Sequence, residues 1–310
     1  MPFVLFALLA LVLLALFSGG YTFFVACMRK KELPWDVQEK LDKTPYGKYY
    51  DLICRSKKFM EDHNAKEVHI RSFDSKKLHA LWVPAENPKG TILLAHGYRS
   101  NKFVDFSLAF EFYHKYGMNI LAPDQRSHGK SEGRYITFGV KESRDMQAWI
   151  AYHNKTLGNY PMILSGLSMG ASTMLYLADR ELPENVKGII ADCGFTSPWE
   201  IVSCVFRRVI HLPAAPSMWA AELFTRLFAG FSLREKDTRH TLKKAKLPVF
   251  LVHGKDDGFV PCAMTEEGYA ACSGPKEILL VDGADHGLSF VVAQDRYTEM
   301  IRNFLKRYIE

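Results

Sequence analysis

The chain has few cysteines, and it lacks the spacings in which cysteines bind metal or form a disulfide framework. Six cysteines are spread over 310 residues, no Cys-x-x-Cys pair occurs, and none is spaced from a histidine as in a zinc site. Six are too few to hold a chain of this length together by disulfides, so we expect reduced and mostly buried thiols. The sequence therefore predicts no metal centre and a fold that depends on one large hydrophobic core.

Signatures of nucleic-acid and phosphate binding are also missing. The net charge is +6, but the basic residues form short clusters at 29–31, 207–208 and 243–244 rather than a stripe with interleaved aromatic residues. The stretch His128-Gly129-Lys130-Ser131 contains Gly-Lys-Ser, yet Asp124 stands where a phosphate-binding loop needs its first glycine. We therefore expect no nucleic acid among the partners of this protein.

Charge is absent from the first 28 residues. Residues 3–17 are all apolar, residues 18–22 are more mixed, and the apolar run continues to Met28. A helix over this stretch would be about 39 Å long at about 1.5 Å per residue, which is enough to cross a hydrocarbon core of about 30 Å with some tilt. The sequence predicts a transmembrane anchor in residues 1–31.

The charges that follow this span predict its orientation. Arg29, Lys30 and Lys31 come directly after it, and no lysine or arginine precedes it. Positive residues beside a span tend to stay on the cytoplasmic face, so we expect a single-pass protein with its following domain in the cytoplasm. The alternatives are a cleaved signal peptide, although the positive n-region is missing, or a lipoprotein signal that ends at Val25-Ala26-Cys27.

The remainder of the chain divides into a linker and one globular domain. Residues 32–65 are charged and aromatic, and they predict a juxtamembrane linker and helix. In residues 66–310 a strand pair is followed by short apolar runs that alternate with helical stretches, which is typical of an α/β fold with a mostly parallel sheet covered by helices on both faces. The predicted strands are 68–71, 78–83, 91–95, 118–122, 162–165, 186–191, 248–253 and 277–281.

One insertion interrupts this alternation. More than fifty residues separate the strand that ends at Ala191 from the one that begins at Pro248. Apolar residues at helical spacing predict two or three short helices there, which are either extra core or a helical lid, residues 197–243, with an apolar underside over the site. An apolar lid would favour a substrate with an apolar acyl or aromatic group, because closing it expels water.

The stretch Gly166-Leu167-Ser168-Met169-Gly170 is the strongest functional signal. An apolar strand ends just before it and a helical pattern over Ala171 to Arg180 follows, so Ser168 is expected on a sharp strand-to-helix turn that exposes its hydroxyl. A serine hydroxyl needs a histidine base to act as a nucleophile, and that histidine needs an acid to orient it.

The base is predicted to be His286. In the chain order that goes with this turn, the acid and the histidine follow the serine. Of the four histidines after Ser168, His253 ends a strand, whereas His286 lies in a loop after the last strand, where catalytic residues of such sheets collect. The other two are His211 and His240.

The acid is predicted to be Asp257. It lies in the loop after the strand that ends at His253. Its neighbour Asp256 is the alternative in the same loop, Asp192 is a second-line alternative after the preceding strand, and Asp285 is more typical of an exposed loop residue.

Two backbone N–H groups are needed to stabilise an oxyanion. One is expected from Met169, directly after the serine. The other is expected from Tyr98 in the loop His96-Gly97-Tyr98-Arg99, which follows the strand at 91–95. His96 precedes the serine and ends a strand, so we interpret it as a structural residue of that loop.

Together these motifs resemble the α/β-hydrolase superfamily, and within it the monoacylglycerol lipase and serine aminopeptidase-like group. The resemblance covers roughly residues 66–308. The family usually has glycine where Ser127 stands; that loop is structural in the family. The matching motifs are His96-Gly97, Asp124-x-Arg126-x-His128-Gly129-x-Ser131, Gly166-x-Ser168-x-Gly170, His253-Gly254-x-x-Asp257-x-x-Val260-Pro261 and His286.

The resemblance implies a membrane-anchored serine hydrolase that cleaves carboxylic esters through an acyl-enzyme. It would need no metal or organic cofactor, and its partners would be the lipid bilayer and a small ester or lipid-like substrate. Serine aminopeptidase, thioesterase and acyltransferase activities are alternatives with the same nucleophile. A non-catalytic anchored binding protein is a further alternative, against which the intact set of Ser168, Asp257 and His286 argues.

Overall fold

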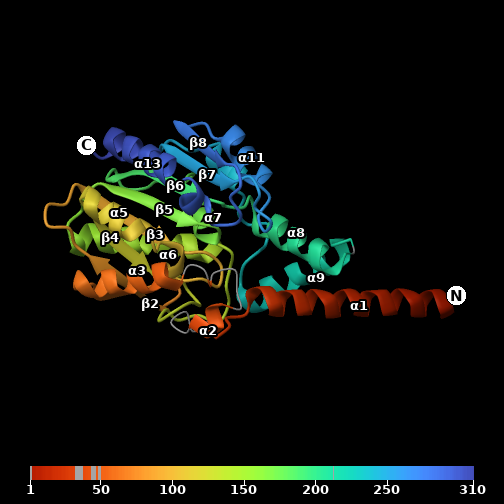
Figure 1. Cartoon of the computed structure of the whole chain (residues 1–310). Coiled ribbons are helices and arrows are strands. Elements are labelled where there is room, and N and C mark those ends of the chain that lie inside the picture. The colour runs from red at the N-terminus through yellow and green to blue at the C-terminus, as the bar shows by residue number, and fades with distance from the viewer. Residues whose placement is uncertain (1, 32–37, 43–46, 48–49, 212) are drawn as a thin grey trace.

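The structure, a computed structural model, describes residues 2–31, 38–42, 47, 50–211 and 213–310 (Figure 1). A central sheet lies between helices, and one long helix, α1 Pro2–Cys27, extends away from this body (Figure 1).

The sheet has eight strands in the order β1-β2-β4-β3-β5-β6-β7-β8. β1 and β2 pair antiparallel, β2 and β4 do the same, and all later neighbours run parallel. Each predicted strand is present and the α/β expectation is confirmed. The strands are β1 Lys66–Arg71, β2 Lys77–Val83, β3 Gly90–Ala95, β4 Met118–Pro123, β5 Met162–Leu167, β6 Val186–Asp192, β7 Val249–Gly254 and β8 Lys276–Val281.

Both faces of the sheet are apolar, because strands buried on both sides carry hydrophobic residues at successive positions. In β3, Leu93 packs in a core beneath α6, α7 and α10, whereas Ile92 packs in a second core beneath α3, α5 and α13. The helices concerned are α3 Tyr50–Asp62, α5 Ala109–Tyr116, α6 Val140–Tyr152, α7 Met169–Leu175, α10 Thr238–Leu242 and α13 Gln294–Tyr308. Shorter elements are α2 Gln38–Leu41, α4 Lys102–Asp105, η2 His153–Leu157, α11 Ala263–Ala271 and α12 Ser289–Val292.

The helix after Ser168 is shorter than its pattern predicts. α7 begins at Met169 and ends at Leu175, whereas the sequence predicts a helix to Arg180. Beyond Leu175 the chain continues in tighter turns, because Leu177 N–H donates to the carbonyl of Met174 at 3.0 Å, three residues earlier.

The N-terminal apolar run forms a continuous helix, α1 Pro2–Cys27. It is long and apolar enough to cross a membrane, with a mean hydropathy of 2.6 over its most apolar window, and only 6% of that window is buried. Part of the expected linker in residues 32–65 lies outside the described residues. Its described part includes α3, which buries Phe59 and Met60 against the sheet.

The insertion between β6 and β7 forms α8 Pro198–Ile210, α9 Ala215–Phe224 and η3 Thr225–Ala229 before it reaches α10. Figure 1 shows α9 alongside the second half of α1, with α8 next to it. The contact between α1 and α9 is close: a Cβ on Gly19 would lie 2.4 Å from that of Ala220, so this position admits only glycine.

Candidate active site

Ser168 occupies the tight turn between β5 and α7. Its φ of +56° and ψ of −117° are a strained conformation for a residue with a side chain. The crossing of the backbone at this turn requires glycine beside it, since a Cβ on Gly170 would lie 1.8 Å from the carbonyl oxygen of Ala95. The turn directs the hydroxyl away from the sheet and toward the loop after β8.

That loop brings His286 to the serine. His286 Nε2 lies 2.9 Å from Ser168 Oγ, and Nδ1 of the same ring lies 2.7 Å from Asp257 Oδ2. Asp257 in turn belongs to the loop after β7. Three residues that are distant in sequence therefore form one line of hydrogen bonds along the carboxyl edge of the sheet.

Asp257 is held as a carboxylate. Its side chain is 0% exposed, and its Oδ1 accepts hydrogen bonds from the N–H groups of Phe259 at 2.8 Å and Val260 at 2.7 Å. Burial alone would raise the pKa of Asp257, but hydrogen bonds from His253 and His286 outweigh burial and hold that pKa well below its usual value.

The alternative acids occupy other positions. Asp256 is exposed. Asp285 is exposed too, and its Oδ1 accepts from the N–H groups of Gly258 and His286, which orders the loop. Asp192 is buried, accepts from Tyr297 Oη at 3.1 Å, and lines the cavity described below. Within the described residues, Asp257 is the one of these acids whose carboxylate is hydrogen-bonded to the ring of His286.

The loop after β3 lies against the serine. A Cβ on Gly97 would be 3.3 Å from Ser168 Cβ, so the loop reaches the elbow at this residue. Gly97 N–H donates to Asp105 Oδ2 at 2.5 Å, and His96 Nε2 accepts from Gln125 N–H at 3.0 Å. Burial lowers the pKa of His96 to about 4, so its ring is neutral and serves to fix the loop.

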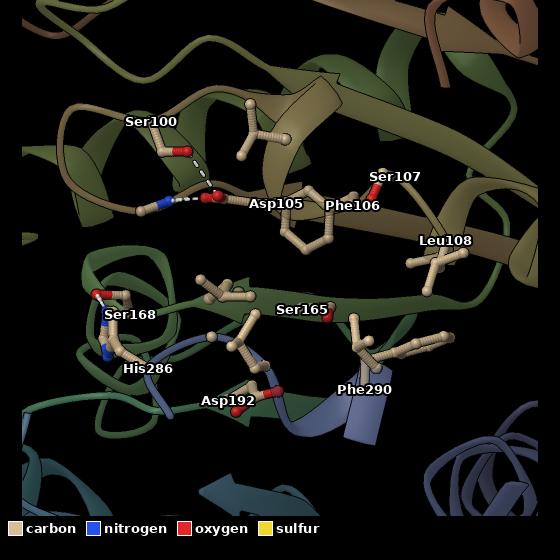
Figure 2. A pocket seen from close by; sticks show the side chains of 18 of the residues that line it. Ser100, Asp105, Phe106, Ser107, Leu108, Ser165, Ser168, Asp192, His286 and Phe290 are labelled. Atoms are coloured by element: carbon tan, nitrogen blue, oxygen red, sulfur yellow. Dashed lines mark hydrogen bonds between the residues drawn. The ribbon is translucent and has the colours of Figure 1, made fainter. Parts of the chain in front are cut away.

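A cavity of about 550 Å³ opens beside the serine. Figure 2 shows Ser168 and His286 at one end and Leu108 and Phe290 at the other. Much of the wall is apolar. Its residues come from the helices α3, α4, α5 and α12 and from loops at the carboxyl edge of the sheet. Its apolar members include Leu52, Ile53, Val104, Phe106, Leu108, Leu167, Leu288, Phe290 and Val291.

Two carboxyl groups, those of the half-buried Asp105 and the buried Asp192, interrupt this apolar wall. Burial raises the pKa of Asp105 to about 6, and hydrogen bonds from Gly97 and Ser100 oppose that effect (Figure 2). Burial also raises the pKa of Asp192. The cavity therefore combines apolar walls with two positions where a polar or cationic group of a ligand would find an acceptor.

The expected lid does not contribute to this cavity. Among the described residues, no wall residue comes from 197–243. The helices α8 and α9 pack instead with α1 and with the far side of the elbow, where Met169 is buried among Phe195 and Ile201. Several apolar side chains of the segment remain exposed, namely Val209, Ile210, Trp219, Leu223, Leu227 and Phe228.

A cluster with metal-binding atoms also occurs at the site. Atoms of Cys193, Asp257 and His286 lie within 4.8 Å of one another. Burial raises the pKa of Cys193 well above its usual value, so the thiol stays protonated, and the other two residues are already bonded to each other. These groups fit proton transfer better than metal binding.

The backbone at Ser127 shows why the family usually has glycine at this position. Ser127 has a φ of +64°, in the region that favours glycine. Its hydroxyl donates to the carbonyl of Tyr135 at 2.7 Å, and its N–H donates to the carbonyl of Glu132 at 3.1 Å. These bonds offset the backbone strain.

Sequence reasoning did not identify the cavity residues Asp105 and Phe290. Asp105 lies eight positions after Gly97, at the end of the short helix α4, where an aspartate is an ordinary surface residue. Only the folded chain shows that its carboxyl turns inward to Gly97. Phe290 lies on an amphipathic stretch, which indicates burial without indicating a ligand.

The sheet order and the strand-turn-helix at Ser168 are those of an α/β hydrolase. A sequence profile described as "Serine aminopeptidase, S33" matches residues 86–241. The protein YqkD of Bacillus subtilis is 30% identical over 234 residues, which cover 75% of each chain. The chain therefore belongs to the serine aminopeptidase S33 family of α/β hydrolases.

Solved structures agree with this fold. The esterase Pf2001 of Pyrococcus furiosus superposes with a TM-score of 0.66 at 25% identity, over 81% of this chain and 96% of that one. The esterase EaEST of Exiguobacterium antarcticum has the same fold, with a TM-score of 0.57 at 19% identity, over 78% of this chain and 100% of that one. The protein is thus a member of a hydrolase family whose fold is shared with esterases.

Proposed function

We propose that this protein is a membrane-anchored serine esterase that acts on esters with an apolar acyl or aromatic group. The observation that supports this most is the chain of hydrogen bonds from Ser168 through His286 to Asp257, at one end of a largely apolar cavity of about 550 Å³.

The geometry suits acyl transfer. With Asp257 ionised, His286 donates from Nδ1 to that carboxylate, so Nε2 is left unprotonated and takes the proton of Ser168 as Oγ attacks the ester carbonyl carbon. The imidazolium then protonates the leaving alcohol oxygen, the C–O bond breaks, and an acyl-enzyme remains. Water, deprotonated by the same nitrogen, then attacks the acyl carbon. The imidazolium returns this proton to Ser168 Oγ as the bond between the acyl carbon and Oγ breaks, which releases the acid and the free serine.

The oxyanion would form between two backbone N–H groups. Met169 follows the nucleophile directly, and Tyr98 follows Gly97, which lies against Ser168. Donors held in this way act mainly on the transition state, because the oxygen gains its full charge only there. No metal or organic cofactor enters these steps.

Serine aminopeptidase activity is the second candidate, and the buried carboxyl of Asp192 favours it, because its Oδ1 has no hydrogen-bond partner within the described residues. A carboxylate in an apolar cavity would bind an ammonium group strongly, and an ester without an amine would leave it unpaired. The choice between the two functions follows from whether neutral p-nitrophenyl esters and monoacylglycerols, or aminoacyl amides, are the faster substrates.

Ser168→Ala tests the nucleophile. In full-length protein in detergent we expect kcat to fall by at least about 10³-fold on every substrate that is turned over, because the members of such a set act as a unit. Ser143→Ala, at another buried serine, is the matched control and should keep wild-type activity. Substantial hydrolysis by Ser168→Ala would refute the proposed mechanism.

We also propose that α1 stays in the mature protein as a transmembrane anchor with the hydrolase domain in the cytoplasm. Arg29 to Lys31 follow the apolar helix, which supports this orientation. Intact cells or spheroplasts treated with protease should leave the domain undigested until they are lysed. Digestion without lysis would place the domain outside, and a mature N-terminus at Tyr21 or Cys27 would show that the helix is cleaved.

A further inference from the structure

The carboxyl end of α1 is bonded to the loop that follows β3. Tyr98 Oη donates to the carbonyl of Ala26 at 2.8 Å. The guanidinium of the next residue, Arg99, donates through Nη2 to the carbonyl of Met28 at 3.1 Å and to that of Val25. Two consecutive side chains of one loop thus satisfy three carbonyls at the end of one helix.

These bonds meet a physical need of the helix. The last carbonyls of an α-helix have no partners within it and carry partial negative charge, so a cation with several donors is favourable there. The guanidinium also lies 4.8 Å over the ring of Tyr98, and that ring stacks on Phe138 at a centroid distance of 5.4 Å. The two side chains are therefore held in one orientation.

The backbone of the same loop faces the serine. Arg99 has a φ of +54°, and its N–H donates to His128 Nε2 at 3.0 Å, while Gly97 lies against Ser168. The loop is thus hydrogen-bonded on two sides, to His128 within the domain and to the end of α1. The N–H of Tyr98 belongs to the same loop, one residue before the N–H of Arg99 that is bonded to His128.

The end of α1 is itself fixed to the domain. Cys27 is 1% exposed and its carbonyl accepts from Ile136 N–H at 2.7 Å. Arg29 continues this pairing, because its N–H donates to the carbonyl of Arg134 at 2.9 Å and its Nη1 to that of Ser131 at 2.7 Å. The end of α1 is therefore held against the domain at the point where it bonds to Tyr98 and Arg99.

We propose that the carboxyl end of α1 positions the oxyanion loop, with Tyr98 and Arg99 as positioning residues. This inference rests on the proposed function, in which Tyr98 N–H stabilises the oxyanion. It extends that function, because the anchor becomes part of the active site. Loss of α1 would remove three acceptors from these side chains and lower the rate of the chemical step, in addition to releasing the domain from the membrane.

The test compares Arg99→Met and Tyr98→Phe with the wild type, as full-length protein in detergent, on a p-nitrophenyl ester. We expect kcat to fall about 10- to 100-fold in Arg99→Met and about 3- to 10-fold in Tyr98→Phe, with KM within about 3-fold, because oxyanion contacts act on the transition state. Arg71→Met is the matched control: Arg71 Nη1 donates to the carbonyl of Ser75 at 3.1 Å, outside both α1 and the loop after β3, so this variant also loses a bond to a backbone carbonyl and should keep kcat within about 2-fold.

Three results would overturn the proposal: an unchanged kcat in Arg99→Met, an equal loss in Arg71→Met, or a rise in KM alone. If Arg99→Met does not fold, Tyr98→Phe still decides, because it removes one hydroxyl and keeps the stacked ring. Ser168→Ala separates this inference from the proposed function. Hydrolysis that survives Ser168→Ala refutes the function, whereas hydrolysis that requires Ser168 and survives Arg99→Met refutes only the positioning by α1.

A second inference concerns the antiparallel edge of the sheet, which β1 and β2 form. His69 and His79 are cross-strand partners in β1 and β2, and Glu67 precedes His69 by two residues on the same face. Their ligand atoms lie within 4.8 Å of one another, with His79 Nε2 3.7 Å from Glu67 Oε2. Lys130 donates to the other carboxylate oxygen, Oε1.

His79 is the informative member of this group. It is 2% exposed, and its Nε2 has no hydrogen-bond partner within the described part of the chain, whereas buried nitrogens are nearly always bonded. Its Nδ1 lies 2.8 Å from Asp124 Oδ2. A carboxylate behind one ring nitrogen is the arrangement that orients a histidine whose other nitrogen binds a metal.

We infer that Glu67, His69 and His79 bind one divalent transition-metal ion, of which Zn²⁺ fits two imidazoles and a carboxylate best, with water completing the shell. Its role would be to fasten β1 to β2.

The test is calorimetry with Zn²⁺ alone on metal-stripped full-length protein, in which we expect one site per chain. His69→Ala should weaken binding by at least about 10-fold. His63→Ala, at a histidine outside the group, is the matched control. No binding, or equal binding by His69→Ala, would refute the site.

Discussion

Asp192 ends β6 and Asp257 follows the neighbouring parallel strand β7, and both carboxyl groups are buried at the same edge of the sheet. Their partners differ. Asp257 accepts from two backbone N–H groups and from His286, and its pKa is held well below the usual value. Asp192 accepts from Tyr297, its Oδ1 has no hydrogen-bond partner within the described residues, and its pKa is raised.

Since both carboxyl groups are buried, the difference between their pKa values comes from their hydrogen bonds, and these keep Asp257 ionised. An orienting acid must be ionised to fix the tautomer of a histidine and to stabilise the imidazolium. Asp257 meets that requirement over a wide pH range. Asp192 faces the cavity instead, where its raised pKa is suited to contact with a ligand and unsuited to orienting His286.

The largest expected effect comes from Asp257→Asn. An amide in place of the carboxylate would favour the wrong tautomer of His286, so we expect kcat to fall by about 10³- to 10⁴-fold. The comparison predicts that Asp192→Asn changes kcat on a neutral ester by less than about 5-fold. Steady-state kinetics of both variants on one p-nitrophenyl ester measures the difference. A larger loss in Asp192→Asn than in Asp257→Asn would exchange the roles of the two aspartates.

A medium effect is expected on stability. Because the folded-state pKa of Asp192 is raised, its ionisation destabilises the fold as pH rises from the usual value of 3.8 through the raised pKa. Asp192→Asn, which stays neutral, should therefore raise Tm by about 2–4 °C at pH 8. Near pH 3, where the carboxyl is protonated in both states, the two proteins should differ little. Thermal melts at both pH values check this, and an equal shift at both would contradict it.

Asp257 should show the opposite slope. Its folded-state pKa is depressed, so the stability that its carboxylate contributes is present above the usual value of 3.8 and is lost as pH falls through the depressed pKa. Asp257→Asn is thus expected to lower Tm at pH 8. Thermal melts at pH 8 should therefore show a higher Tm for Asp192→Asn and a lower Tm for Asp257→Asn than for the wild type. A shift of the same sign in both variants would contradict the contrast between the two sites.

The smallest expected effect is that of Ser127→Gly, outside both carboxyl sites. Glycine would relieve the positive φ, but it would lose the hydroxyl bond to the carbonyl of Tyr135. Each contribution is on the order of 1 kcal/mol and they oppose each other. We therefore expect Tm within about 2 °C of the wild type and unchanged kcat. A large loss of activity would show that this loop does more than support its neighbours.

Local patterns in the sequence predict much of this fold. The eight strands follow from short apolar runs, and the elbow follows from glycines on both sides of Ser168, because these signals depend on neighbouring residues only. The sequence also predicts His286 and Asp257 as loop residues after adjacent strands, and the structure brings both to Ser168. Their catalytic role stays a prediction.

Other features depend on contacts between distant segments, which periodicity does not encode. The apolar insertion at 197–243 predicts helices, yet its sequence does not indicate that they pack beside α1 instead of lining the cavity. Nor does the sequence reveal that Arg99 reaches the carbonyl of Met28, 71 residues away. An apolar run at the N-terminus predicts an anchor, and only the folded chain shows that its end is bonded to the loop after β3.

The central claim is that Ser168 is the acylated nucleophile and that Asp257, not Asp192, supports it. The most direct measurement is mass spectrometry of full-length protein after reaction with a fluorophosphonate, with labelling rates for the wild type, Asp257→Asn and Asp192→Asn. The account predicts one adduct, on Ser168, formed about 10³-fold more slowly in Asp257→Asn and at nearly the wild-type rate in Asp192→Asn. An adduct on another residue, or slower labelling in Asp192→Asn than in Asp257→Asn, would contradict it.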